Sequence, residues 1–153
     1  IGPTGPAGPT GPAGTNGAAG PAGTPGAAGS PGPTMFCVAA SDEFTPLTVG
    51  GTKTTWRMPF GFSLTEVRAS LTSAQSAGDL LTVDVKRNGT SIFATKITFD
   101  NGEKTTTLAA TANVLTSTSL ALAADDEMTI DINQVGSGAD ATGLKVYLLG
   151  TPT

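Results

Sequence analysis

The side chains that most often carry catalysis are sparse in this chain. It contains no histidine and a single cysteine, Cys37. Without histidine there is no Ser-His-Asp or Cys-His arrangement, and the commonest general base at neutral pH is missing. The glycines precede no helical pattern, so no phosphate-binding loop is predicted. The sequence therefore predicts no catalytic, metal-binding or cofactor-binding residue, and no enzyme.

The acidic side chains offer one alternative. The run Asp125-Asp126-Glu127 could ligate a hard cation such as Ca²⁺, which prefers oxygen ligands. The interpretation we favour is a solvated turn leading into the strand that begins near Met128. Asp84, Asp131 and Asn133 fall on the outward positions of alternating segments, so we expect them on the surface rather than in a site.

Three further residues or motifs each have a plain structural explanation. Cys37 could bridge two chains, but we favour a small buried hydrophobe. Trp56 beside Arg57 could stack on a sugar, but a lone tryptophan in a β domain more often belongs to the core or to a subunit interface. Asn88-Gly89-Thr90 matches the N-glycosylation triplet and is also a strong hairpin-turn signal, which explains it without a sugar.

The first fifth of the chain is a repeat with glycine at every third position. Eleven Gly-X-Y triplets follow one another without interruption, and proline fills many of the X positions. Three polyproline II chains can wind around one axis only if every third residue has no side chain. The sequence predicts a triple helix whose axis is formed by Gly2, Gly5, Gly8, Gly11, Gly14, Gly17, Gly20, Gly23, Gly26, Gly29 and Gly32.

This prediction makes the molecule a homotrimer with a rod-like stalk over residues 1–34. The alternative is a flexible Gly/Pro/Ala linker. At roughly 3 Å of rise per residue, the stalk would be about 100 Å long. The phase of Ile1 before Gly2 suggests a repeat that continues upstream. The stalk carries no charged pair to set the register of three chains, so the part that follows must align them.

Residues 35–153 have the pattern of an all-β domain. Apolar residues alternate with polar ones in 67–72, 81–86 and 128–133. Turn signals such as Asn88-Gly89 and Asp100-Asn101-Gly102 separate these runs. Residues 117–124 are expected to form a loop or a short helical turn. The predicted strands are 35–40, 46–49, 53–58, 62–73, 80–87, 91–99, 104–109, 113–116, 127–133 and 143–150.

The expected fold class is an N-terminal collagen triple helix followed by an all-β C-terminal domain, a jelly-roll-like β-sandwich, in a homotrimer. Residues 92–97 and 144–149 are apolar on both sides, which suits strands that fill the sandwich and also meet neighbouring subunits. The net charge of −4 argues against nucleic acid or an anionic membrane as a partner. No run of about 20 apolar residues predicts a membrane span, and no signal peptide is recognisable.

A collagen-like repeat followed by a Thr-rich β domain resembles the trimeric fibres of tailed bacteriophages. Residues 52–73, 80–99 and 126–150 look similar to a β domain of phage structural and tail proteins. The resemblance implies a virion component. It would dock onto other virion structural proteins through its N-terminal side, and its head could touch a host-surface glycan or protein. No receptor-binding residue can be transferred from it.

The expected function is thus a structural virion fibre whose stalk projects a trimeric head for host attachment. One alternative is a bacterial surface or spore-coat protein of the same design, located on the cell or spore instead of the virion. Another is a glycan-cleaving enzyme with paired carboxylates, but no two carboxylates stand at a recognisable spacing.

Overall fold

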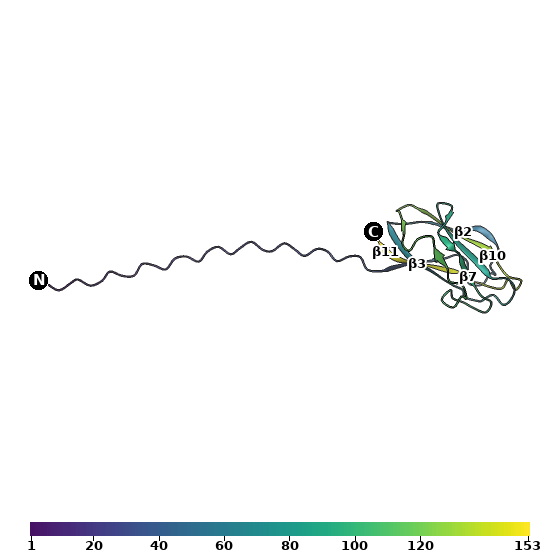
Figure 1. Ribbon diagram of the computed structural model, residues 1–153, viewed down its shortest axis with the longest axis horizontal. Coiled ribbons are helices and arrows are strands. Elements are labelled where there is room, and N and C mark those ends of the chain that lie inside the picture. The colour runs from purple at the N-terminus through teal and green to yellow at the C-terminus, as the bar shows by residue number, and fades with distance from the viewer.

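The computed structural model describes all residues, 1–153, and divides them into two unlike parts. A long, thin N-terminal segment projects from one end of a β-rich head (Figure 1). The head contains strands and connecting loops but no helix. Accordingly, no helix is long and apolar enough to cross a membrane. We call residues 1–33 the extended segment and residues 34–153 the head.

Eleven strands make up the head. Their bounds are β1 (Thr34–Ala39), β2 (Gly50–Arg57), β3 (Phe62–Ser70), β4 (Leu81–Arg87), β5 (Thr90–Ser91), β6 (Phe93–Thr95), β7 (Ile97–Phe99), β8 (Val114–Leu115), β9 (Leu120–Leu122), β10 (Glu127–Gln134) and β11 (Lys145–Pro152).

The strands form two main sheets whose order is nested. One sheet runs β1-β11-β3-β9, and the other runs β2-β10-β4-β5, with β7 also pairing with β4. Thus the first strand pairs with the last, β2 with β10, β3 with β9 and β4 with β5, all antiparallel. This is the strand order of a jelly roll, in which one long hairpin is wrapped into two facing sheets. A small third sheet, β6-β8, closes one side.

The core follows directly from the alternating pattern. Leu81, Val83 and Val85 of β4 are fully buried, as are alternate residues of β10 that face them. In β3 the inward residues are Phe62 and Leu64, and then Val67 and Ala69. The change of phase comes from a bulge, because Leu64 pairs with Gly150 whereas Glu66 pairs with Leu149. An extra residue, Thr65, therefore lies outside the ladder.

Several predicted strands differ from those observed. Residues 46–49 and 104–109 form no strand, and residues 91–99 break into β5, β6 and β7. Residues 120–122, expected in a loop or a short helical turn, form β9. In contrast, the hairpin at Asn88-Gly89 is confirmed, with φ angles of 49° and 82° that suit a type I′ turn.

The predicted N-terminal triple helix is wrong for the structure described here, and with it the fold class as expected. Residues 1–33 form one extended chain with no secondary structure, and all of them are exposed. A Cβ added at any of the glycines from Gly2 to Gly32 would meet no atom within 4 Å. The steric demand for glycine arises only where three chains touch, and this single chain makes no such contact. The observed fold class is an all-β, sandwich-like head with an extended N-terminal segment.

Candidate functional site

The largest hollow of the head lies beside β3. It has a volume of about 500 Å³ and is open to solvent. One wall is β3 itself, and the other is the stretch 106–118, which runs past it. We call this hollow the β3 groove. Its lining residues are Thr65, Glu66, Val67, Arg68, Thr106, Thr107, Ala109, Ala112, Asn113, Val114, Leu115, Ser117 and Thr118.

The groove exists because strand pairing stops early on this side of β3. The neighbouring strand β9 pairs only with Phe62–Leu64. Farther along β3, one isolated backbone bridge between Ser70 and Thr105 and two side chains take the place of a neighbouring strand. The Ala69 N–H donates to Thr106 Oγ1 (3.0 Å), and Asn113 Nδ2 donates to the Val67 carbonyl (3.0 Å). These bonds fix the 106–118 stretch to the sheet without filling the space between them.

A planar ion pair stands in the groove. Arg68 Nε lies 2.6 Å from Glu66 Oε1, and Arg68 Nη2 lies 3.2 Å from Glu66 Oε2. Hydrogen bonds to Glu66 raise the pKa of Arg68. Both side chains remain about half exposed, so the pair itself adds little to stability. The bidentate contact leaves Arg68 Nη1 as a donor without a partner in the chain.

Hydroxyl groups make up much of the remaining lining. Thr65 donates to the Leu149 carbonyl (3.2 Å), and Ser117 donates to the Ser119 carbonyl (3.0 Å). A hydroxyl that donates one hydrogen bond still has acceptor lone pairs. Thr118 makes no hydrogen bond within the chain. The groove thus offers many neutral donors and acceptors and no nucleophile–base pair, an arrangement suited to binding.

Sequence reasoning missed this groove. The Thr-rich stretch 104–119 was expected to hold strands at 104–109 and 113–116, of which only β8 forms. The available signal was the composition itself: a run of threonine and serine with little large apolar content cannot fill both faces of a strand.

A second polar cluster lies on β4 and β10, and it corrects another prediction. Asp84 and Asp131, expected on the surface, are 1% and 4% exposed. They sit directly opposite each other across the strand pair. Lys86 pairs with Asp131, and Lys96 Nζ lies 3.1 Å from Asp84 Oδ2. Two carboxylates and two ammonium groups therefore balance in charge.

Every carboxylate oxygen of this cluster has a partner. Ser91 Oγ donates to Asp84 Oδ1 (2.6 Å), and the Thr52 N–H donates to Asp131 Oδ1 (2.6 Å). Burial alone would raise the pKa of Asp131, but the hydrogen bonds from Lys86 and Thr52 outweigh it and hold the pKa below its ordinary value. Asn133, the third residue expected to face outward, is exposed and accepts a hydrogen bond from Lys96 (2.9 Å). With its oxygens satisfied, the cluster stabilises the sheet.

The run 125–127 forms a tight turn, as we favoured. Asp126 accepts hydrogen bonds from the Ala123 N–H (2.8 Å) and from Asn88 Nδ2 (2.7 Å). These contacts, the Ala123 bond first, lower the pKa of Asp126. Glu127 instead pairs with Arg57 (2.9 Å). No group of three His, Cys, Asp or Glu side chains in the structure could hold a metal ion.

Two of the singled-out residues lie near the open edges of the sheets. Cys37 is exposed on β1, so the prediction of a buried hydrophobe is wrong. Trp56, on β2, is half-buried and packs against the core. Thr54 Oγ1 of β2 donates to the Ala39 carbonyl of β1 (3.3 Å) and so links the two edge strands.

No family model matches the chain, and neither does any curated protein or any solved structure.

Proposed function

We propose that this chain is a structural fibre protein of a virion, in which the extended segment holds the head at a distance so that the head can contact the host surface. The observation that carries this proposal is the separation of the two parts (Figure 1). The extended segment has no charged residue, is exposed throughout and packs against nothing. Such a segment serves as a spacer, whereas the head has a buried core of its own and a hollow on its surface beside β3.

The location of the protein in its native source tests this proposal. Antibodies raised against residues 34–153, coupled to gold, would be applied to purified particles and cells and viewed by electron microscopy. Label at the outer ends of fibres on virions is the expected result. Label confined to a bacterial cell wall or spore coat would contradict it and favour a surface adhesion protein of the same architecture.

We also propose that the heads associate as a homotrimer, and that β1 is where the copies meet. β1 is the outer strand of its sheet. The hydrogen bond from the Ala40 N–H to the Leu144 carbonyl (2.8 Å) sets the phase of the β1–β11 ladder, so Met35 and Cys37 turn their backbone groups away from β11. The same residues present exposed side chains, and Met35 is 55% exposed. Unpaired strand edges with apolar side chains favour association.

Substitution at this edge gives a direct test. Met35→Lys places a charge on the proposed contact, so we expect the mass in solution to fall from three chains to one while the melting temperature of the head stays close to that of the parent. Sedimentation equilibrium of residues 1–153 and of 34–153 measures this. The matched control is Thr90→Lys, an exposed position on β5 of the other sheet. A parent chain that is already monomeric would contradict the trimer.

A further inference from the structure

We infer that the β3 groove is a binding site for a neutral oligosaccharide. This inference rests on the proposed role of the head in attachment and names the class of ligand that the head would take. The groove combines planar polar groups with hydroxyls and small apolar side chains. A sugar ring offers matching groups, namely hydroxyls that donate and accept hydrogen bonds and an apolar C–H face.

The polar groups suit vicinal hydroxyls. Glu66 and Arg68 form a fixed planar pair with a donor and acceptor side by side, and Arg68 Nη1 has no partner in the chain. Asn113 uses its Nδ2 to hold the Val67 carbonyl, which fixes its amide and leaves Oδ1 as an acceptor. Both walls are thus positioned before a ligand arrives, and a rigid site loses less entropy on binding.

The charges and apolar groups narrow the ligand class. Glu66 and Arg68 are the only charged lining residues and cancel each other, so the groove has no excess positive charge to attract a phosphate or nucleic acid. It also has no aromatic ring of the kind that anchors protein partners. Val114, which is half exposed, and the neighbouring alanines offer methyl groups to the C–H face of a sugar.

Because the groove has no aromatic ring on which a sugar could stack, we expect one head to bind an oligosaccharide weakly, with a dissociation constant on the order of 1 mM. Several heads acting together would compensate by multivalency. The site can therefore be weak in each chain and still hold a particle to a surface.

Saturation-transfer NMR with residues 1–153 tests the inference. The probes are cellotriose, triacetylchitotriose and a galactose trisaccharide, with inorganic phosphate as the anionic comparison. We expect transfer to at least one trisaccharide and none to phosphate. Arg68→Ala should weaken binding about tenfold or more, because hydrogen bonds to charged groups are strong, and Arg68→Lys should not restore it since lysine lacks the planar fork.

The chain offers a matched control in Arg57→Ala. Arg57 forms a comparably exposed ion pair with Glu127 at another place on the head, at 2.9 Å against 2.6 Å for Arg68 and Glu66. This variant should bind like the parent, and near-ultraviolet circular dichroism should show that both variants are folded. No transfer to any trisaccharide, binding of phosphate instead, or equal binding by Arg68→Ala would each overturn the inference. This assay does not depend on where the protein is located. If antibodies label fibres on virions but no sugar binds, the oligosaccharide site in the β3 groove is rejected and the proposed fibre function is not.

Discussion

Asp131 shows how a residue that alternation places on the outer face of a strand can still be buried. It is 4% exposed, accepts the Thr52 N–H and pairs with Lys86. Alternation predicts which face of a sheet a side chain occupies, but not whether other side chains then cover that face. The cover comes from Lys86 and from the bulge of β2 at Thr52, neither of which is near Asp131 in sequence.

The first prediction concerns the effect of Asp131 on how the stability of the head depends on pH. The pKa of Asp131 is lowered in the folded state, so its contribution is fully present above the ordinary Asp value of 3.8 and is lost as the pH falls through the lowered folded value. We expect the free energy of unfolding to decrease on acidification below about pH 4. Urea unfolding between pH 2 and 7 measures it.

Asp131→Asn should destabilise the head by about 1–3 kcal/mol at pH 7, because Lys86 loses its partner and the pair is mostly shielded from water. The substitution should also make the free energy of unfolding depend less on pH below about pH 4. Glu66→Gln, which breaks an exposed ion pair, should cost less than about 1 kcal/mol. Equal effects from the two substitutions would contradict the cluster's structural role.

The second prediction concerns Gly150, beside the bulge of β3. A Cβ at this position would stand 2.0 Å from the Ser63 carbonyl oxygen, a backbone atom that cannot easily move. Gly150→Ala should therefore lower the free energy of unfolding by about 2 kcal/mol or more. Gly14→Ala is the control, since an added Cβ there meets nothing and should leave thermal unfolding of the head unchanged. Differential scanning calorimetry compares the two.

At the scale of elements, the long alternating runs could be predicted from sequence and the short pieces could not. The runs that became β4 and β10 carry an apolar residue at every second position, and those residues are buried, so their sequence pattern is strong. In contrast, β9 has only three residues and is held by its pairing with Phe62–Leu64. The 104–109 stretch pairs with β3 only at one isolated bridge, Ser70 to Thr105, because beyond it the Thr106 hydroxyl, rather than a backbone carbonyl, takes the Ala69 N–H. Such tertiary contacts leave no signal in the local hydrophobic pattern, so the Thr- and Ser-rich composition of the stretch is the only local sign of the β3 groove.

The third prediction tests the turn that joins β4 to β5. Asn88 has a positive φ of 49°, donates to Asp126 and accepts the Glu127 N–H (2.9 Å). Asn88→Ala loses both hydrogen bonds and places a residue less tolerant of this conformation in the turn. We expect a loss of about 2 kcal/mol in chemical denaturation. Thr90→Ala, next in the hairpin and exposed, should be close to neutral, and a similar loss there would argue against this explanation.

At the scale of the whole molecule, the division at residue 34 was visible in composition, because charge, aromatic residues and alternation all begin after the repeat. The conformation of the repeat, in contrast, could not be predicted from its period of three residues. A glycine at every third position is the pattern that a triple helix requires, but a single chain has no contacts that would impose that helix, and an added Cβ at these glycines meets no atom. The extended segment as observed depends on no residue of the head.

The fourth prediction follows from that independence. Residues 34–153 expressed alone should unfold at the same temperature as residues 1–153, within about 2 °C, since no core residue lies in the extended segment. Circular dichroism at a strand wavelength measures both. Small-angle X-ray scattering should show a much larger maximum dimension for the whole chain. A truncated head that melts markedly earlier would reveal contacts that the structure does not contain.

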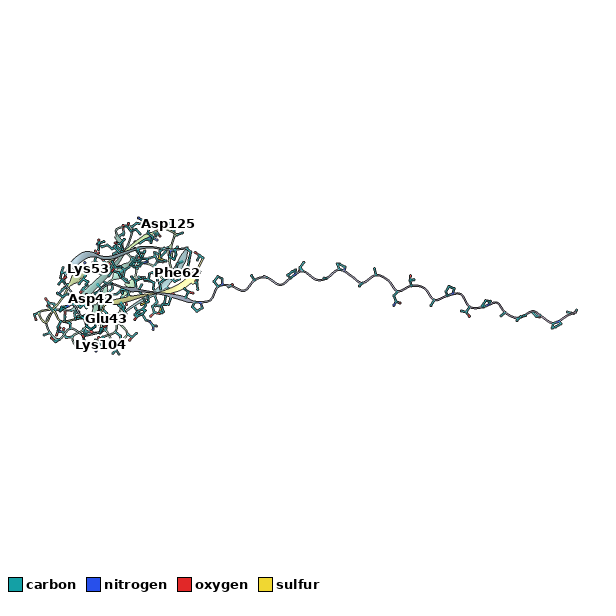
Figure 2. The ribbon with its side chains drawn as sticks, turned by 180° about the vertical axis from the view of Figure 1, so that it is seen from behind. Asp42, Glu43, Lys53, Phe62, Lys104 and Asp125 are labelled. Atoms are coloured by element: carbon teal, nitrogen blue, oxygen red, sulfur yellow. The ribbon has the colours of Figure 1, made fainter.

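The nested strand order brings both ends of the head to one pole. Thr34 pairs with Gly150, so the C-terminus lies beside the place where the extended segment leaves (Figure 1). Phe62 also lies toward this pole, whereas Asp42 and Glu43 lie farther from it (Figure 2). A fluorescent protein or affinity tag fused after Thr153 would thus trail back along the spacer. A peptide that has to face away from the extended segment would instead be inserted in a loop at the opposite pole, between β1 and β2 or between β10 and β11.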